Sequence, residues 1–166
     1  MPSLSHPTTL PMTMRSDVEV DQSGKVERTQ TDTVLAFSNS RRYAIRIPAT
    51  VKRAALHVLR QRHKLSASNK TFYLRLFTAG LYLLLRDHLN VLDCITVDIE
   101  YPGREADIRG MLLPLMRRTD PQYPSDRIVF HRVGKKSPAH SLAWEVHRGK
   151  RRADRVITEK EFLDLL

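Results

Sequence analysis

Alternating apolar and polar positions indicate that the first third of the chain forms short β-strands. Residues 18–21 alternate as Val-Glu-Val-Asp, a Ser-Gly pair at 23–24 is typical of a turn or bulge, and residues 25–27 continue extended. Two further strands are predicted over residues 33–37 and 43–47, where β-branched and aromatic residues are frequent. Three short strands with tight connections predict an antiparallel meander, with neighbours in sequence lying side by side.

From Pro48 onward the apolar residues recur at helical spacing, interrupted by two more strand-like stretches. Ser137 followed by Pro138 is typical of a helix start, and Thr158 with Glu161 three positions later is typical of a capping box. The predicted helices cover residues 48–64, 72–89, 104–118, 138–147 and a short segment after Thr158, and the predicted strands cover residues 94–100 and 127–131. This order predicts an α/β fold with a five-stranded mixed sheet and helices on both faces.

The length of 166 residues suits one domain with a short tail. Residues 1–16 are rich in Pro, Ser and Thr and lack an apolar signal core, so we expect a disordered leader before a single domain over residues 17–166. Cys94 is the only cysteine, which excludes an internal disulfide and a cysteine-based zinc site and favours a reducing compartment. The longest apolar run, residues 81–85, is too short to span a bilayer. We therefore expect a cytoplasmic protein.

Positive charge dominates the chain, with 28 Lys and Arg against 18 Asp and Glu, and its distribution is uneven. Every charged residue between Thr33 and Arg86 is basic, and a second basic cluster lies in a C-terminal extension from about residue 148. A solvated helix face usually mixes both signs, so one sign alone favours a polyanionic partner, here nucleic acid. The alternative for both regions is that these residues only keep the protein soluble. The predicted phosphate contacts are Arg41, Arg42, Lys52, Arg53, Arg60, Lys135, Lys136, Arg151 and Arg152.

Carboxylates are few, and three of them fall where strand ends should meet. Asp21 ends the first strand, and Asp98 and Glu100 share the polar face of the fourth. If these two strands lie side by side, the carboxylates converge and repel one another unless a cation lies between them. Oxygen ligands favour Mg²⁺ or Mn²⁺, which activate water for phosphodiester cleavage. The alternatives are that Asp21 is a turn residue and that Asp98 is an ordinary surface residue of a strand.

The helix after the fifth strand offers a further candidate group. His140 lies in its first turn, directly after a segment containing Lys135 and Lys136, and the helix N-terminus with these lysines suits a phosphate. His140 is therefore a candidate metal ligand or proton carrier, although a lone histidine is more often structural. Trp144, one turn later, is more typical of a core residue than of a platform for stacked bases.

These residues resemble the ribonuclease H-like superfamily, closest to its RuvC-type resolvases. Asp21 matches the acid that ends the family's first strand, and Glu100 best fits the terminal acid of the fourth. Residues 139–143, Ala-His-Ser-Leu-Ala, are similar to the last-helix motif Ala-Asp-x-Leu-Ala, with His140 at the acid's position. Asp87 is the only acid between Val34 and Val91, so the first-helix acid of ribonuclease H proper has no counterpart, which favours the RuvC side.

The resemblance implies two-metal hydrolysis by catalytic residues Asp21, Glu100 and His140, and a homodimer as the working form. We therefore expect a metal-dependent nuclease acting on structured or duplex nucleic acid, with junctions as one such substrate. The alternative is a non-catalytic nucleic-acid-binding protein of the same fold. Docking on an acidic protein or a membrane surface is the weaker third possibility, because no predicted helix combines a basic face with an aromatic, membrane-seeking one.

Overall fold

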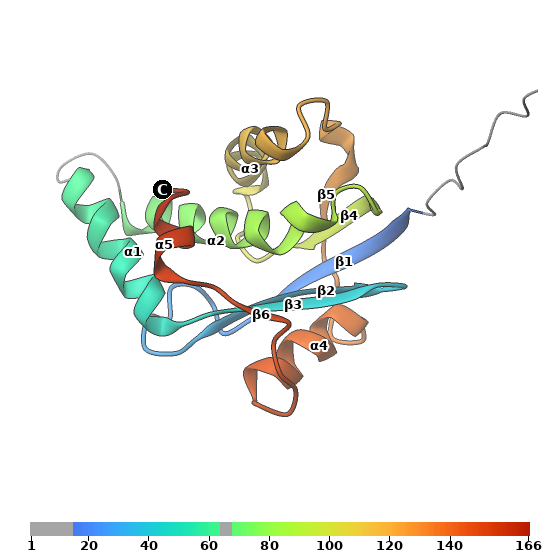
Figure 1. Cartoon of the computed structure of the whole chain (residues 1–166), viewed down its shortest axis with the longest axis horizontal. Helices are drawn as coiled ribbons and strands as arrows, with labels where there is room; N and C mark the ends of the chain where they lie inside the picture. Colours follow the sequence, from blue (N-terminus) through green and yellow to red (C-terminus); the bar gives the residue numbers. More distant parts are fainter. Residues whose placement is uncertain (1–14, 64–67) are drawn as a thin grey trace, which may run out of the picture.

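The computed structural model describes residues 15–63 and 68–166 and shows an α/β architecture, in which helices cover both faces of one mixed sheet (Figure 1). The sheet has six strands in the order β5-β4-β1-β2-β3-β6. Their bounds are β1 Ser16–Ser23, β2 Thr33–Asn39, β3 Arg42–Ile47, β4 Leu92–Asp98, β5 Ile128–His131 and β6 Arg155–Val156. Residues 1–14 of the expected leader lie outside the described residues, and residue 16 already belongs to β1.

The predicted meander is confirmed, since β1 pairs antiparallel with β2 and β2 with β3. β4 lies parallel to β1 on its other side, and β5 lies parallel to β4. The prediction of five strands is wrong by one, because the short β6 pairs parallel with β3 at the far edge of the sheet. A two-residue strand has no alternation pattern, so only its tertiary pairing reveals it.

Residues 25–27 do not continue the first strand as predicted but belong to a loop between β1 and β2. Gly24 begins this loop with φ +69°, and a Cβ at this position would collide with the Asp32 carbonyl and the His147 ring. The Lys52 side chain binds this loop and the start of β2. Its Nζ donates hydrogen bonds to the Arg28 carbonyl (2.7 Å) and to the Thr33 hydroxyl (2.9 Å). The chain therefore leaves the sheet at Gly24, where the left-handed backbone requires glycine.

Four helices, α1, α2, α3 and α5, lie on one side of the sheet, and α4 lies alone on the other (Figure 1). Ser68 caps α2, Ser137 caps α4 ahead of Pro138, and Thr158 forms the predicted capping box with Glu161. The predicted helix over residues 72–89 is shifted, since a 3₁₀ turn replaces its last part. The helices are α1 Ala49–Arg62, α2 Asn69–Leu85, α3 Glu105–Thr119, α4 Pro138–His147 and α5 Glu159–Leu163, with 3₁₀ turns at Arg86–His88 and Ser125–Arg127.

The core consists of two apolar clusters separated by the sheet. β2 is buried on both faces: Leu35 and Phe37 point into the larger cluster with α1, α2 and α3, whereas Val34 and Ala36 face α4. Side chains alternate between the two faces of a strand, so one continuous apolar run supplies both clusters. This arrangement fixes α4 against the strands that carry the polar residues described below.

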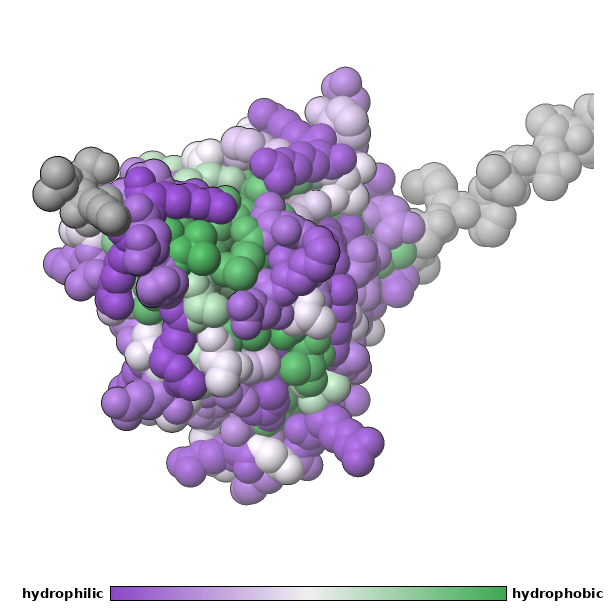
Figure 2. Space-filling view, turned by 60° about the vertical axis from the view of Figure 1, so that its left-hand side comes forward, coloured by the Kyte–Doolittle hydropathy of each residue, from purple (hydrophilic) through white to green (hydrophobic). Residues whose placement is uncertain are grey.

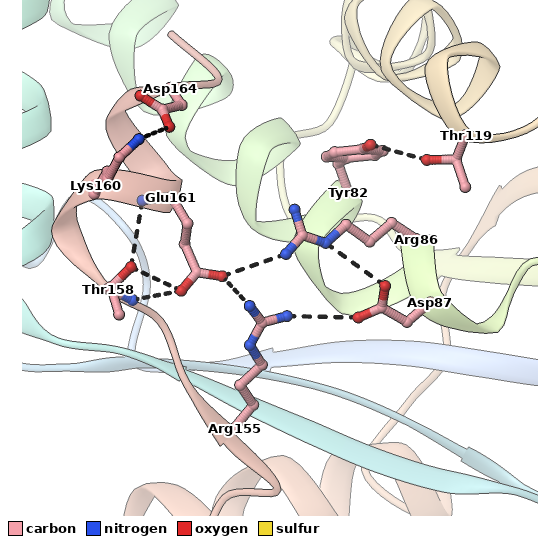
Figure 3. A network of polar contacts seen from close by, with 9 residues as sticks. All are labelled: Tyr82, Arg86, Asp87, Thr119, Arg155, Thr158, Lys160, Glu161 and Asp164. Atoms are coloured by element: carbon pink, nitrogen blue, oxygen red, sulfur yellow. Dashed lines mark hydrogen bonds and ion pairs between the residues drawn. The ribbon is translucent and has the colours of Figure 1, made fainter.

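The C-terminal segment, predicted as a basic extension, is joined to the domain by β6, by the buried Phe162 and by an ion-pair network (Figure 3). Arg155 binds Glu161 (2.5 Å) and Asp87 (3.5 Å), and Arg86 binds the same Glu161 oxygen (3.5 Å). We call Arg86, Asp87, Arg155 and Glu161 the C-terminal ion cluster. Its two arginines pair with two carboxylates, so the charge of Arg155 is balanced by residues of the protein itself.

Hydrophilic side chains predominate on the face shown in Figure 2, with an apolar patch near its centre. Over the part of the chain that the structure describes, none of the helices has the length and apolar character needed to cross a membrane.

Candidate metal centre

Three carboxylates from two neighbouring parallel strands meet at one end of the sheet. Val20 of β1 is level with Val97 of β4, so Asp21 and Asp98 follow at the same height, and Glu100 lies two residues beyond the end of β4. One carboxylate oxygen from each of Asp21, Asp98 and Glu100 lies within 4.8 Å of the other two. We call these three residues the acidic site. The predicted approach of the first and fourth strands is therefore found, with both Asp98 and Glu100 included. Two details of the prediction are wrong: β1 continues to Ser23, so Asp21 does not end it, and β4 ends at Asp98, so Glu100 lies beyond the strand.

Hydrogen bonds from the backbone fix two of the three carboxylates. Asp21 is 6% exposed, and its Oδ1 accepts a bond from the Gln22 N–H (2.7 Å). Asp98 Oδ1 accepts from the N–H of Val133 in the loop after β5 (2.7 Å). The donors, Gln22 and Val133, are not part of the acidic site. Their hydrogen bonds therefore fix the orientation of the Asp21 and Asp98 carboxylates within the protein.

Charge repulsion within the acidic site perturbs Glu100. Burial raises the pKa of this carboxyl to about 7, with further upward contributions from the charges of Asp21 and Asp98, while Lys25 opposes the shift. Lys25 Nζ lies 3.8 Å from Glu100 Oε2, but its side chain is half exposed, so water screens much of its attraction. Burial and the two neighbouring carboxylates therefore outweigh the attraction of Lys25 for Glu100.

His140 joins this arrangement through Asp21 and lies outside the group of three oxygens. Its Nδ1 is 2.7 Å from Asp21 Oδ2. An ionised carboxylate only accepts hydrogen bonds, so Nδ1 donates and, in a neutral ring, Nε2 is left as the acceptor. Ser137 caps α4 and Pro138 begins it, which places His140 in the first turn of the helix, next to Asp21 of β1. His140 is thus positioned to orient Asp21 and to accept a proton.

The donor set suits a hard divalent cation. All three groups are carboxylates, and their oxygens lie close enough together to form a candidate set of ligands. Magnesium and manganese prefer oxygen ligands of this kind, whereas zinc sites usually contain histidine or cysteine. A bound cation would also remove the repulsion that raises the pKa of Glu100.

The predicted phosphate contacts are divided among several surfaces. Arg41 and Arg42 are exposed at the β2–β3 turn, which lies at the end of the meander opposite Asp21, because Ser38 pairs with Glu19 and Asn39 with Val18. Arg53 and Arg60 are exposed on α1. Arg53 contacts the Thr29 carbonyl (2.7 Å) in the β1–β2 loop, on the same side as the acidic site.

Lys52 does not lie on the surface as a predicted phosphate contact would. Its side chain is fully buried, and Nζ binds the β1–β2 loop by the bonds described above. Burial lowers the pKa of this ammonium to about 8, although the carboxylates of Asp32 and Glu27 oppose the shift. The prediction failed because α1 turns this position inward, and loop carbonyls, not phosphates, satisfy its charge.

The remaining predicted contacts flank α4. Lys135 and Lys136 are exposed in the loop between Val133, which binds Asp98, and His140. Arg151 and Arg152 are exposed beyond the end of α4, and Arg151 lies 3.6 Å from Glu145.

Trp144 was expected to be a core residue, but its side chain is 39% exposed. Lys150 and Arg148 lie over its ring, at 4.5 and 5.5 Å from the centroid. One turn from His140, the surface of α4 is therefore aromatic and basic.

Two residues near the acidic site were missed by sequence reasoning. Lys25 lies in a stretch predicted only to be extended, and Gln22 has no predicted role. Gln22 is 8% exposed, and its side-chain nitrogen and oxygen have no hydrogen-bond partner among the described residues. The one indication in the sequence is that both residues follow Asp21 closely, because a turn directly after a strand keeps the chain near the end of that strand.

Comparison of this chain with protein-family models, with curated proteins and with solved structures finds no match.

Proposed function

We propose that this protein is a metal-dependent nuclease of ribonuclease H-like fold that hydrolyses phosphodiester bonds of structured or duplex nucleic acid. The observation that carries the proposal is the convergence of Asp21 in β1, Asp98 at the end of the parallel strand β4 and Glu100 just beyond it, with one oxygen of each within 4.8 Å of the others. The meander followed by a parallel β4 and β5 supports the fold resemblance. The formal charge of +10 makes an accumulation of carboxylates unusual here and supports a polyanionic substrate.

In this proposal the acidic site holds Mg²⁺ or Mn²⁺, with Asp21, Asp98 and Glu100 as the ligands. When bound, the cation supplies charge neutralisation for the phosphate and activation of water. Asp21 is kept in place by Gln22 and His140, so its free lone pairs point into the site. Glu100, whose pKa is raised by burial and by Asp21 and Asp98, gains its full charge when the cation binds.

His140 and the loop before it serve the substrate. His140 is about one-third exposed, so its free ring nitrogen can reach a proton at the water-accessible side of the site. Lys135 and Lys136 precede the N-terminus of α4, and together they provide positive charge for a phosphate group. These residues bind and orient a phosphodiester next to the carboxylates.

A cleavage assay tests the proposal. Purified protein is incubated with Mg²⁺ or Mn²⁺ and a panel of single strands, duplexes, RNA–DNA hybrids and four-way junctions. We expect cleavage of at least one structured substrate, with a loss of about a thousand-fold in the variant Asp21→Asn. The matched control is Asp93→Asn, which neutralises an exposed carboxylate at the opposite end of β4 and should cleave like the parent.

Equal cleavage by Asp21→Asn and the parent, or no cleavage of any substrate, contradicts the nuclease. In the second case, salt-sensitive binding to the same panel would favour the non-catalytic nucleic-acid-binding alternative.

A further inference from the structure

A pocket of about 450 Å³ opens directly beside the acidic site and shares Glu100 with it. Its walls come from the first turns of α2, from the turn between β4 and α3, and from Glu27 in the loop between β1 and β2. The volume lies within the range of about 300–1,000 Å³ that is typical of small-molecule sites. The lining residues used below are Lys70, Tyr73, Tyr101, Pro102 and Arg104.

Aromatic and apolar side chains form most of the pocket wall. Tyr73 and Tyr101 both contribute their rings, and Pro102 adds an apolar surface. Two contacts fix the Tyr101 side chain: its hydroxyl donates a hydrogen bond to Glu27 (2.8 Å), and its ring packs against the Phe77 ring with 5.2 Å between centroids. Rigid aromatic walls of this kind suit a flat, aromatic ligand.

Charged and polar groups complete the pocket. Two basic and two acidic side chains line it: Lys70 and Arg104, and Glu27 and Glu100. Arg104 also pairs with Asp107 (2.5 Å), and the two basic groups suit an anionic group attached to the flat ligand. Burial raises the pKa of the Tyr101 hydroxyl, Glu27 adds to the shift, and the buried Gln22 amide beside it opposes the shift.

We propose that this pocket holds one unpaired nucleotide of the strand whose phosphate lies in the acidic site, an inference that rests on the proposed nuclease function. A base within a duplex has both faces stacked and its edge paired, so it must leave the helix before it can enter such a pocket. Tyr73 and Tyr101 stack on the base, while Lys70 and Arg104 hold its flanking phosphates. The substrate class narrows to nucleic acid with an unpaired nucleotide beside the scissile bond.

Binding in EDTA tests this without cleavage. Fluorescence anisotropy compares three labelled duplexes: one with a single bulged nucleotide, one with an abasic residue at the same position, and one fully paired. We expect the bulged duplex to bind about ten-fold more tightly than the abasic one, because a stacked base contributes roughly 5- to 150-fold in affinity. Equal affinity of the wild-type protein for the bulged and abasic duplexes overturns the proposal, and this comparison needs no variant.

The variant Tyr73→Leu keeps an apolar side chain on α2 but removes the ring, so the preference for the bulged base should disappear, and Tyr73→Trp should restore it. Tyr43→Leu is the matched control, because Tyr43 is also partly buried but packs against Phe37 and His88 away from the pocket. A preference that survives in Tyr73→Leu contradicts the proposal.

Asp21→Asn separates the two hypotheses. A base preference that persists in the wild-type protein and in Asp21→Asn, without cleavage by either, supports the pocket and contradicts the nuclease. Cleavage that depends on Asp21 but shows no base preference supports the nuclease and overturns the pocket.

Discussion

Two groups of buried or half-buried charges in this protein are built in opposite ways. In the C-terminal ion cluster, Arg86 and Arg155 both contact Glu161, and burial of that carboxyl is more than offset by bonds from Thr158 and by the two arginines, which hold its pKa below the usual value (Figure 3). In the acidic site, burial and the neighbouring carboxylates raise the pKa of Glu100 instead. In the first group, arginines and hydrogen bonds of the protein itself favour the charged carboxylate, whereas in the second, burial and the neighbouring carboxylates favour the protonated form.

The largest difference between the two groups should appear in the pH dependence of stability. The folded-state pKa of Glu100 is about 7 against an ordinary value of 4.5, so the folded protein holds this proton more tightly than the unfolded chain. The stabilisation of the folded state by the proton on Glu100 is therefore fully present below pH 4.5 and is lost as the pH rises through 7. Glu100→Gln cannot lose the proton and should be more stable than the wild type at pH 8 by about 3 kcal/mol.

Urea denaturation at pH 5 and pH 8 in EDTA measures this effect. The gain of Glu100→Gln should shrink at pH 5, and Mg²⁺ should stabilise the wild type more than the variant. A variant that is less stable than the wild type at pH 8 would show that Glu100 is already neutralised within the fold.

Removal of the shared carboxylate of Glu161 from the C-terminal ion cluster should lower the stability of the protein, whereas Glu100→Gln should raise it. Glu161→Ala leaves Arg86 and Arg155 facing each other and removes half of the capping box of α5, so we expect a loss of about 2 kcal/mol in unfolding free energy. Glu161→Gln, which keeps a side chain able to cap, should retain part of that stability.

The control for this change is Lys160→Ala, which removes a solvent-exposed pair with Asp164 and should leave the free energy of unfolding nearly unchanged. Thermal unfolding at fixed pH distinguishes these variants. Equal stability of Glu161→Ala and the wild type would mean that the C-terminal ion cluster does not hold the C-terminal segment in place.

The smallest effect is expected at Lys25, the basic residue next to Glu100. Lys25→Met removes the charge that opposes the upward shift, so the pKa of Glu100 should rise further. The change in stability should be about 0.5 kcal/mol or less, because the lysine side chain is half exposed. NMR titration of the Glu100 carboxyl carbon follows the shift, and a lower pKa in Lys25→Met would contradict this description of the acidic site.

The parts of the structure that local pattern controls could be predicted from the sequence. Alternation in β1 and β3, with the run of β-forming residues in β2, identifies the meander, and the start of α4 at Ser137-Pro138 follows from capping chemistry. The approach of Asp21 to Glu100 also follows, because β4 returns parallel to β1 and ends at the same edge of the sheet.

Features that depend on tertiary contacts could not be predicted in this way. Lys52 lies in a stretch where every charge is positive, and nothing local shows that loop carbonyls bury it. Arg155 counted toward a basic extension until β6 and Glu161 placed it inside an ion cluster. The same limitation applies to the pocket, whose walls come from α2 and the β4–α3 turn and meet only in the fold.

The most direct test of the central claim is titration of the purified protein with Mn²⁺, followed by calorimetry or by electron paramagnetic resonance of the free ion. The wild type and Asp93→Asn should bind Mn²⁺ alike, and Asp21→Asn should bind at least about ten-fold more weakly, because it removes one of three charged ligands. Equal binding by Asp21→Asn and the wild type, or no binding by either, would contradict the assignment of Asp21, Asp98 and Glu100 as a metal site.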